Sequence, residues 1–452
     1  MINEEIFRAY DIRGIYPSEV NEDFAYILGK SYGSILQEKY GYKACVVSHD
    51  NRISSPMLTE NLIKGILETG CKVIFLGLTT TPMNYYARNL KNVPGIMVTA
   101  SHNPKDDNGF KFSFDGMINA RGEMITDFLA YTKKCEFLTG NGTIEKIDIK
   151  DEYVKFLKET IKYGSKKRKV VIDPGNGVGS ILVHDVFDDA YIEPIYINDI
   201  SDGTFPNHHP DPAVEENLTQ LKEAVLENNA DYGIAFDGDC DRIGIVDNKG
   251  NMLPIEYFMI LNIQNIIDKV ENKTFLYDIK CSKSVEDSIR KLGGNPLCYR
   301  TGASYSEYKV VNDKIPFGCE YSGHAFFTDR TLECGSALYA ALRFIELMSF
   351  EENDLTYIVK DFPKYFSTPE IKIPTIDSIK FSVVEKVKEF AKEKNYNIND
   401  IDGVRITFED GWVLVRASNT GPNLIFRAES VSEQRVKELE DEYLLLIETY
   451  NK

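Results

Sequence analysis

Short apolar runs alternate with amphipathic stretches at the start of the chain. Residues 44–48 (ACVVS), 72–77 (KVIFLG) and 94–100 (PGIMVTA) are compact apolar runs typical of strands, and residues 55–70 carry an amphipathic helical pattern. Strands that alternate with helices in this way indicate a parallel sheet with helices on its faces. We therefore predict an α/β domain over residues 1–149.

The same alternation continues further along the chain. Residues 169–180 have the pattern of a strand, a glycine-rich turn and the start of a helix, and residues 232–246 that of a strand, an acidic loop and a strand. This pattern predicts a second α/β domain over residues 150–252. Its polar loops follow strand ends, which is where ligands bind in open α/β sheets.

A third unit of the same kind is predicted over residues 253–366. It contains alternating strand and helix patterns at 274–279, 284–294, 296–302 and 317–327. Like the first two units, it brings a polar loop to the end of a strand. The fold class is therefore α/β, with three similar domains built on mixed or parallel sheets.

The pattern changes from residue 367 to the end of the chain. A helical pattern at 380–394 precedes three apolar runs (GVRITF, GWVLVRAS and PNLIFRAE), and a long helical pattern covers 431–449. Strands that follow one another between two helices indicate an antiparallel sheet. We predict a smaller α+β domain over residues 367–452.

Composition narrows the classes of partner. The chain has 452 residues, 43% hydrophobic and 27% charged, and a formal net charge of -18. This charge argues against nucleic acid or an anionic membrane as the main partner. No apolar run reaches the ~18 residues that span a bilayer, and the N-terminus does not resemble a signal peptide. The eight cysteines are far apart without a CxxC pair, so we expect reduced thiols and a cytoplasmic location.

The loop between the strands of residues 232–246 is rich in carboxylates. Asp237, Asp239 and Asp241 are spaced two residues apart, so their oxygens can converge on one hard cation such as Mg²⁺. An EF-hand is excluded because Arg242 and Asn248 stand where that loop needs Gly and Glu. A solvated acidic turn is the alternative, but such turns seldom lie between two apolar strands.

The segment TASHNPKDDNGFK follows the apolar run at 94–100. Ser101 and His102 are adjacent, and adjacent side chains of an extended segment point to opposite sides; a G-x-S-x-G elbow is also absent. Ser101 is therefore better explained as a phosphoryl acceptor beside Mg²⁺ than as a hydrolase nucleophile. Lys111 can reach back as an acid, a base or a charge partner. The alternative for Ser101 is a simple turn residue.

Two further loops carry polar groups suited to a sugar phosphate. The segment from Arg416 to Pro422, with Arg427 beyond it, combines arginines, hydroxyls and an amide that can surround a phosphate; a hairpin turn is the alternative. The loop from Glu320 to His324 offers a carboxylate, a hydroxyl and an imidazole, which suit a polyol. A structural hydrogen-bond network explains this second loop equally well.

These segments together resemble the α-D-phosphohexomutase family, most closely its bacterial phosphomannomutase/phosphoglucomutase group. The segment FRAYDIRG at residues 7–14 matches the opening motif of the family. TASHNP resembles its phosphoserine loop, DGDCDR its metal loop, EYSGH its sugar loop and RASNT its phosphate loop. The five motifs occur in the family order and cover the whole chain.

The resemblance implies four domains around one central cleft and a defined reaction. Members interconvert hexose 1-phosphates and hexose 6-phosphates, here of mannose or glucose, through a phosphoserine and a hexose 1,6-bisphosphate that also serves as activator. Mg²⁺ would be held by Ser101, Asp237, Asp239 and Asp241, and catalysis would use Ser101, His102, Lys111 and Arg242. The residues implied to bind substrate are Tyr10, Arg13, Arg52, Lys280, Thr301, Gly302, Glu320, Ser322, His324, Arg416, Ser418, Asn419, Thr420 and Arg427.

Two positions depart from the family pattern near the substrate. Tyr321 stands where this group commonly has Met, and Ala303 where a His is frequent. Glu320 and Ser322 would grip O3 and O4 of the sugar, which are the same in glucose and mannose, so both phosphates are expected to react. Tyr321 is the residue that would make the enzyme prefer glucose phosphate over mannose phosphate, by crowding the axial C2 hydroxyl of mannose.

Other functions remain open at this point. A phosphoglucosamine mutase is a weaker alternative because position 321 is not Gln. A catalytically silent sugar-phosphate-binding protein and a Mg²⁺-dependent phosphatase are further alternatives. The expected partners are small-molecule sugar phosphates, without nucleic acid or membrane, and the chain is expected to be a monomer, with a dimer as the alternative.

Overall fold

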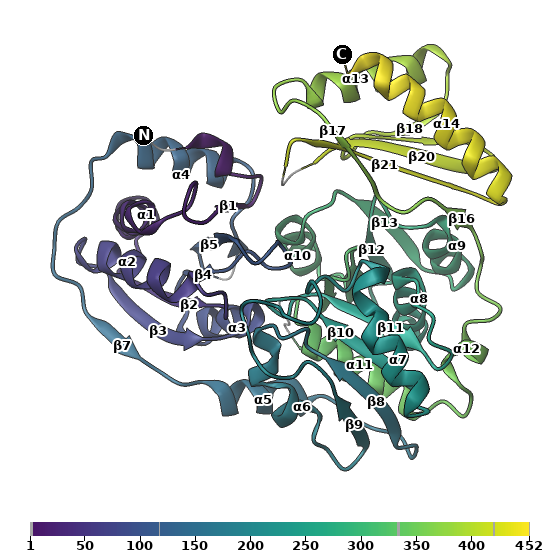
Figure 1. Ribbon diagram of the computed structural model, residues 1–452, viewed down its shortest axis with the longest axis horizontal. Coiled ribbons are helices and arrows are strands. Elements are labelled where there is room, and N and C mark those ends of the chain that lie inside the picture. The colour runs from purple at the N-terminus through teal and green to yellow at the C-terminus, as the bar shows by residue number, and fades with distance from the viewer. Residues whose placement is uncertain (1–2, 117, 332–334, 419–420, 452) are drawn as a thin grey trace.

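The computed structural model describes residues 3–116, 118–331, 335–418 and 421–451. Figure 1 shows the first domain at the left, the second and third side by side below and to the right, and the C-terminal domain above them. Three α/β units and a smaller α+β unit are present, as the sequence predicts. No helix among the described residues is long and apolar enough to span a membrane.

The first domain contains a seven-stranded mixed sheet of order β1-β5-β4-β2-β3-β7, with β6 paired to β5. Strand β4 is buried along its whole length, and the Ser101 loop leaves its C-terminal end. The antiparallel pair of β1 and β5 places Asp11 opposite Lys111. The strands are β1 (Asp11–Ile15), β2 (Ala44–His49), β3 (Lys72–Leu78), β4 (Gly95–Val98), β5 (Asp107–Asp115), β6 (Ile118–Asn119) and β7 (Ile144–Lys146), and the longer helices are α1 (Glu22–Ile35), α2 (Ser55–Leu67), α3 (Thr81–Lys91) and α4 (Glu123–Lys134).

The second domain has a four-stranded sheet of order β11-β10-β8-β9. Strands β10 and β11 are buried and antiparallel, and the loop between them carries the three aspartates. The strands are β8 (Arg168–Asp173), β9 (Ile192–Tyr196), β10 (Tyr232–Phe236) and β11 (Ile243–Asp247), and the helices are α5 (Lys150–Glu159), α6 (Val183–Phe187) and α7 (Thr219–Glu227).

The third domain repeats this plan with a sheet of order β13-β12-β14-β15. The sugar loop lies between β14 and β15, which pair antiparallel. The strands are β12 (Thr274–Asp278), β13 (Asn295–Tyr299), β14 (Phe317–Cys319) and β15 (Ala325–Phe327), and the helices are α8 (Ile255–Ile266), α9 (Lys283–Lys291), α10 (Ala303–Asn312), α11 (Ala337–Ser349) and α12 (Leu355–Ile358).

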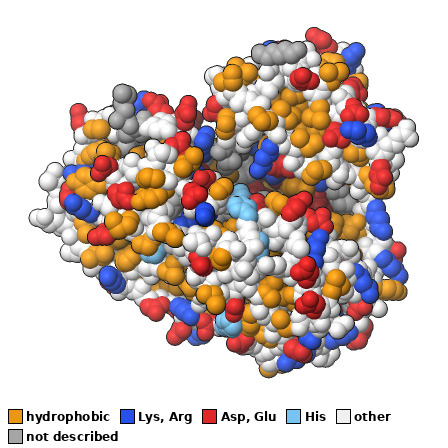
Figure 2. Space-filling view, viewed as in Figure 1, with side chains coloured by type: hydrophobic (Ala, Val, Ile, Leu, Met, Phe, Trp, Pro, Cys, Tyr) orange, Lys and Arg blue, Asp and Glu red, His pale blue; other side chains and the backbone are white. Residues whose placement is uncertain are grey.

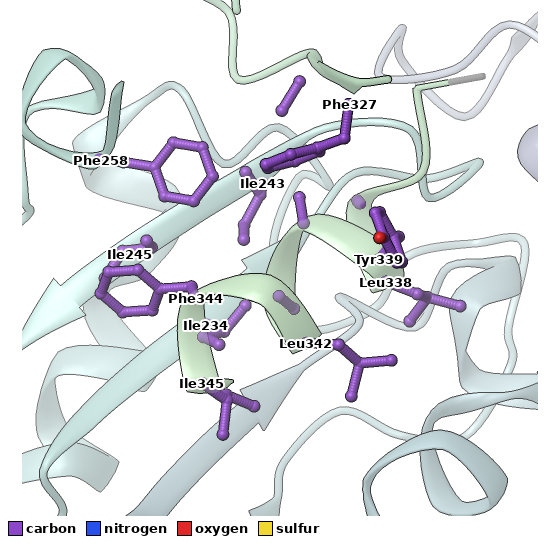
Figure 3. Close-up of a cluster of buried hydrophobic side chains, with 14 of the residues drawn as sticks. Ile234, Ile243, Ile245, Phe258, Phe327, Leu338, Tyr339, Leu342, Phe344 and Ile345 are labelled. Atoms are coloured by element: carbon purple, nitrogen blue, oxygen red, sulfur yellow. The ribbon is translucent and has the colours of Figure 1, made fainter. Parts of the chain in front are cut away.

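Helix α11 joins the second and third domains into one core. Every residue of this helix is buried, and its apolar side chains pack with Ile234, Ile243 and Phe258 of both domains (Figure 3). Its two charged residues, Arg343 and Glu346, are buried as well, so the helix is covered on all sides. One hydrophobic core therefore runs through these two domains and reaches Val46, Ile74, Met83 and Ala87 of the first domain, which also has a core of its own, as does the C-terminal domain.

The C-terminal domain places two helices against an antiparallel sheet of order β16-β21-β20-β19-β18, with β17 also paired to β21. The phosphate loop joins β20 and β21. The strands are β16 (Phe366–Ser367), β17 (Ile371–Pro374), β18 (Asn397–Asn399), β19 (Val404–Thr407), β20 (Gly411–Ala417) and β21 (Asn423–Ser430), and the helices are α13 (Lys380–Glu393) and α14 (Glu433–Tyr450).

Candidate active site

The loops singled out in the sequence meet in one cleft between the domains. Figure 2 shows a hollow between the first and the C-terminal domains in which basic, acidic and histidine side chains gather. All four domains contribute to its wall. The wall residues that the sequence predicted are Tyr10, Arg13, His102, Lys111, Asp241, Arg242, Lys280, Thr301, Gly302, Glu320, Ser322, His324, Arg416 and Ser418.

Ser101 is held in an unusual backbone conformation, and the next residue, His102, lines the cleft. Its φ of 53° lies in the left-handed region, which few non-glycine residues adopt. Its hydroxyl donates to Asp237 Oδ2 at 2.8 Å, and its backbone N–H donates to Thr99 Oγ1 at 2.9 Å. The loop therefore aims one buried hydroxyl at the acidic loop of the second domain.

Arg52 holds the Ser101 loop in place, whereas the sequence predicts it among the residues that bind substrate. Its guanidinium donates to the carbonyl oxygens of Ser101 and Asn103, each at 2.7 Å, and to those of Pro104 and Asp107. The side chain is fully buried and is absent from the described wall of the cleft. The expectation that Arg52 lines the cleft is therefore wrong: the residue supports the loop from beneath.

The three aspartates form a buried cluster that fits a metal ion. One oxygen from each of Asp237, Asp239 and Asp241 lies within 4.8 Å of the others. Oδ1 of Asp239 and Oδ1 of Asp241 are buried without a hydrogen-bond partner among the described residues. Leaving buried carboxylate oxygens unpaired is costly, so these atoms suit a dication as ligands.

A glycine allows the two loops to come this close. A Cβ atom on Gly238 would lie 2.6 Å from the carbonyl oxygen of Ser101, closer than side chains tolerate. Glycine is thus required where the acidic loop passes over the Ser101 loop.

Lys111 supplies positive charge to the same cluster. Its Nζ lies 2.6 Å from Oδ2 of Asp239 and 2.6 Å from Oδ2 of Asp241. Burial alone would lower the pKa of Lys111, but the two aspartates outweigh it and raise that pKa. Burial likewise opposes the charge on Asp239, yet Lys111 lowers the pKa of this carboxyl overall. The lysine is therefore a permanent cation here.

Two histidines at the cleft are neutral near neutral pH. Burial, and then Arg242, lower the pKa of His102, whose Nδ1 lies 3.4 Å from the Ser101 hydroxyl. Burial also lowers the pKa of His324 to about 3. His324 Nε2 accepts from Arg242 Nε at 3.1 Å, so it holds the Arg242 guanidinium beside the acidic loop.

Four family models match the chain in order and together cover most of it. They describe α/β/α domains I, II and III and the C-terminal domain of phosphoglucomutase/phosphomannomutase, and they match residues 4–137, 151–250, 255–366 and 370–446. The chain belongs to the phosphoglucomutase/phosphomannomutase family. Membership makes it an enzyme of hexose phosphate interconversion and confirms the predicted class.

Individual relatives agree with this assignment. The chain is 38% identical over 451 residues to a phosphomannomutase/phosphoglucomutase of Pseudomonas putida, covering 98% of this chain and 96% of the relative. It is 34% identical over 453 residues to a phosphoglucomutase of Neisseria meningitidis, covering 99% and 98%. A family protein of Burkholderia thailandensis has a crystal structure with a TM-score of 0.91 at 32% identity, covering 100% of this chain and 98% of that one.

The sugar loop of this family member is tied to the loop after β13. Glu320 Oε1 accepts from the Gly302 N–H at 2.8 Å and from the Ser306 hydroxyl at 2.7 Å. Burial, and then the charge of Asp278, raise the pKa of Glu320 to about 7. Its second oxygen and Ser322 are the groups available for sugar hydroxyls.

Tyr321 points away from the cleft. Its ring lies 4.0 Å from the Arg427 guanidinium and lines a separate cavity behind the sugar loop. The structure therefore contradicts the expectation that Tyr321 crowds the C2 hydroxyl. Of the neighbouring residues, Glu320 lines the cleft alone and Ser322 lines both cavities.

Of the two arginines predicted to bind phosphate, Arg416 lies in the cleft wall and Arg427 does not. Arg416 lines the cleft and is held by Asp402, with Nε 3.0 Å from Oδ2. Arg427 donates instead to the carbonyl oxygens of Lys280 and Thr368, so its predicted place in the phosphate site is wrong and it joins two domains. Asn419 and Thr420 lie outside the described residues.

Some wall residues were missed in the sequence. Tyr85, Asn119, Glu370 and Lys372 also line the cleft. None of these four residues belongs to one of the five motifs, and each lies at a distance along the chain from the motif loops. The only feature of the sequence that could have indicated them is the charged pair Glu370 and Lys372 in the segment PEIK.

Proposed function

We infer that the protein moves a phosphoryl group between O1 and O6 of glucose and mannose phosphates, with a hexose 1,6-bisphosphate as intermediate. One observation carries this inference: the Ser101 hydroxyl lies 2.8 Å from Asp237, beside a buried carboxylate cluster, and the two loops that meet there also place His102 and Asp241 in the wall of a cleft that four domains build. A pure binding protein has no need of a hydroxyl in that place.

In this proposal phosphoserine 101 is the donor. The bond between phosphorus and Ser101 Oγ breaks as a bond to a sugar hydroxyl oxygen forms, and the hydroxyl proton passes to a neutral base. His102, neutral through burial, has its Nδ1 3.4 Å from the Ser101 hydroxyl and is assigned as this base. Lys111 and Arg242 face the charge that develops on the phosphoryl oxygens.

Mg²⁺ would be held by Asp237, Asp239 and Asp241 together with the phosphate on Ser101. When bound, it neutralises charge on the phosphoryl group. The buried oxygens without partners on Asp239 and Asp241 support this assignment. If it is right, Mg²⁺ raises the melting temperature of the parent protein but not that of Asp239→Asn, and chelator removes activity.

The substitution Ser101→Ala tests the proposed donor. We expect turnover of glucose 1-phosphate to fall by at least about a thousandfold, since no other group can carry the phosphoryl. Mass spectrometry of the parent should find phosphate on the peptide containing Ser101. Ser34→Ala, a buried serine of the same domain away from the cleft, is the matched control. Parent-like turnover by Ser101→Ala would refute the proposal.

A comparison of substrates separates the remaining functions. Initial rates with glucose 1-phosphate and mannose 1-phosphate should differ by less than about 100-fold, because Glu320 and Ser322 grip groups common to both epimers. Release of free phosphate without isomerised product would favour a phosphatase, and binding without turnover a silent binding protein. The monomeric state and the cytoplasmic location stay predictions.

A further inference from the structure

Three residues form one row across the sheet of the C-terminal domain. Lys372 on β17 is directly opposite Ile425 on β21, and Ile425 is directly opposite Arg416 on β20. Residues that face each other across paired strands point to the same side of a sheet. All three line the cleft, so Lys372 and Arg416 flank Ile425 on the face that looks into the active site.

The direction of Lys372 follows from the alternation of its strand. Ile371 and Ile373 pack against the core of the domain. Successive side chains of a strand point to opposite faces, so Lys372 is directed to the cleft side. Neighbouring strands lie ~4.8 Å apart, which puts the backbones of Lys372 and Arg416 roughly 10 Å from each other, a span that two long side chains can close around one anion.

Charge distinguishes Lys372 from the other cations at this end of the cleft. Lys280 is paired with Glu370 at 2.8 Å, and Arg416 is paired with Asp402 at 3.0 Å. Lys372 is exposed, and its side chain has no ion pair or hydrogen bond among the residues that the structure describes. Its charge acts on the nearby Glu370 carboxylate, but that carboxylate is paired with Lys280, so Lys372 is a positive charge in the wall without a bonded counterion, within a chain of net charge -18.

A phosphate monoester brings a charge of about −1.5 to −2 at neutral pH. The two paired cations are already balanced by carboxylates, so a bound dianion needs positive charge from elsewhere. We propose that Lys372 contacts the phosphate that is not reacting and closes on it from the side opposite Arg416. This inference rests on the proposed function, because it assigns a further residue to the substrate site.

The test measures binding rather than turnover. In the Ser101→Ala background, which cannot transfer phosphate, calorimetry would titrate glucose 6-phosphate and, separately, inorganic phosphate at one salt concentration. Lys372→Met should weaken glucose 6-phosphate binding about tenfold or more, and Lys372→Arg should stay within about threefold of the background, because it keeps the charge. Lys392→Met, an exposed lysine on α13 of the same domain, should change nothing.

The outcomes separate this inference from the proposed function. Binding by Lys372→Met as tight as the background would overturn the role of Lys372, whether or not the parent enzyme isomerises sugar phosphates. Equal weakening by Lys372→Met and Lys372→Arg would also overturn it, since the charge would not then be the cause. A parent that binds glucose 6-phosphate with this dependence on Lys372 but never isomerises it would refute the proposed function alone.

Discussion

Arg52 shows how one side chain fixes the geometry of the reacting group. It lies under the Ser101 loop with its guanidinium turned to backbone carbonyl oxygens, and Asp50 neutralises its charge at 3.2 Å. The left-handed backbone of Ser101 costs energy, and these hydrogen bonds offset that cost. The position of the hydroxyl thus depends on a residue that never meets the substrate.

We expect Arg52→Met to destabilise the protein by at least about 3 kcal/mol, because several buried carbonyl oxygens lose their donor and the buried Asp50 carboxylate loses its ion-pair partner. Urea unfolding of the purified variant would measure this loss. Arg290→Met, an exposed arginine paired with Glu286 on α9, should stay within about 0.5 kcal/mol of the parent. Equal stability of the two variants would contradict the role given to Arg52.

Glu320 predicts a dependence of stability on pH. Burial raises its pKa from 4.5 to about 7, so the folded state holds this proton more tightly than the unfolded chain does. The contribution of Glu320 to the stability of the folded protein is therefore complete at low pH and is lost as the pH rises through about 7. Glu320→Gln removes this contribution, and at about pH 8 the variant should be more stable than the parent, by up to ~3 kcal/mol.

Unfolding free energies of parent and Glu320→Gln between about pH 5 and pH 8 would test this expectation. The difference between the two proteins should be small at the acid end and grow toward the alkaline end. A difference that is constant across the range would show that Glu320 is ionised throughout.

Helix α11 is the element on which the two central domains depend. By its place in the chain it belongs to the third domain, yet it lies against β8 and β11 of the second domain as well as β15 of the third. Its side chains fill the space between these sheets (Figure 3). The fold of either domain is therefore incomplete without this helix.

Leu342→Ala in this helix should cost about 2–5 kcal/mol, the usual range for a leucine removed from a packed core. Leu342 is fully buried, whereas Leu445 on the surface helix α14 is 66% exposed. Leu445→Ala is thus the matched control and should change stability by less than about 0.5 kcal/mol. If both variants unfold at the same denaturant concentration, α11 is not a core element.

At the scale of the whole molecule, a cluster around Trp412 is one of the contacts that position the C-terminal domain against the third domain. Trp412 is the single tryptophan of the chain and packs with Leu414 against Ile279 of the third domain. The Arg405 guanidinium lies 3.9 Å from the Trp412 ring and donates to the carbonyl oxygens of Ile279 and Cys281.

Trp412 therefore reports on this cluster. We expect Arg405→Ala to loosen it, since two buried carbonyl oxygens lose their donor. Trp412 emission should shift to longer wavelength and become easier to quench with acrylamide at temperatures where circular dichroism still shows folded protein. Arg435→Ala, on the outer helix α14, should leave emission unchanged. Unchanged emission in Arg405→Ala would mean that the cluster holds without this arginine.

The sequence by itself determined the class of fold and most of the chemistry. Strands, helices and the motifs at strand ends are local in the chain, so hydrophobic periodicity and short residue patterns suffice to find them. Ser101, Asp237 and Glu320 each belong to such a motif, and the structure brings their loops into one cleft. The order of the motifs indicated the family, which the comparisons confirm.

Only the tertiary structure decided which side chains turn toward the cleft. Arg52 and Arg427 are arginines of the kind that bind anions, but both donate instead to backbone carbonyl oxygens of loops distant in the chain. Tyr321 turns to Arg427, and Lys372 turns to the cleft because neighbouring isoleucines enter the core. A side chain's direction depends on what packs against its element from elsewhere in the chain, and no local pattern encodes that contact.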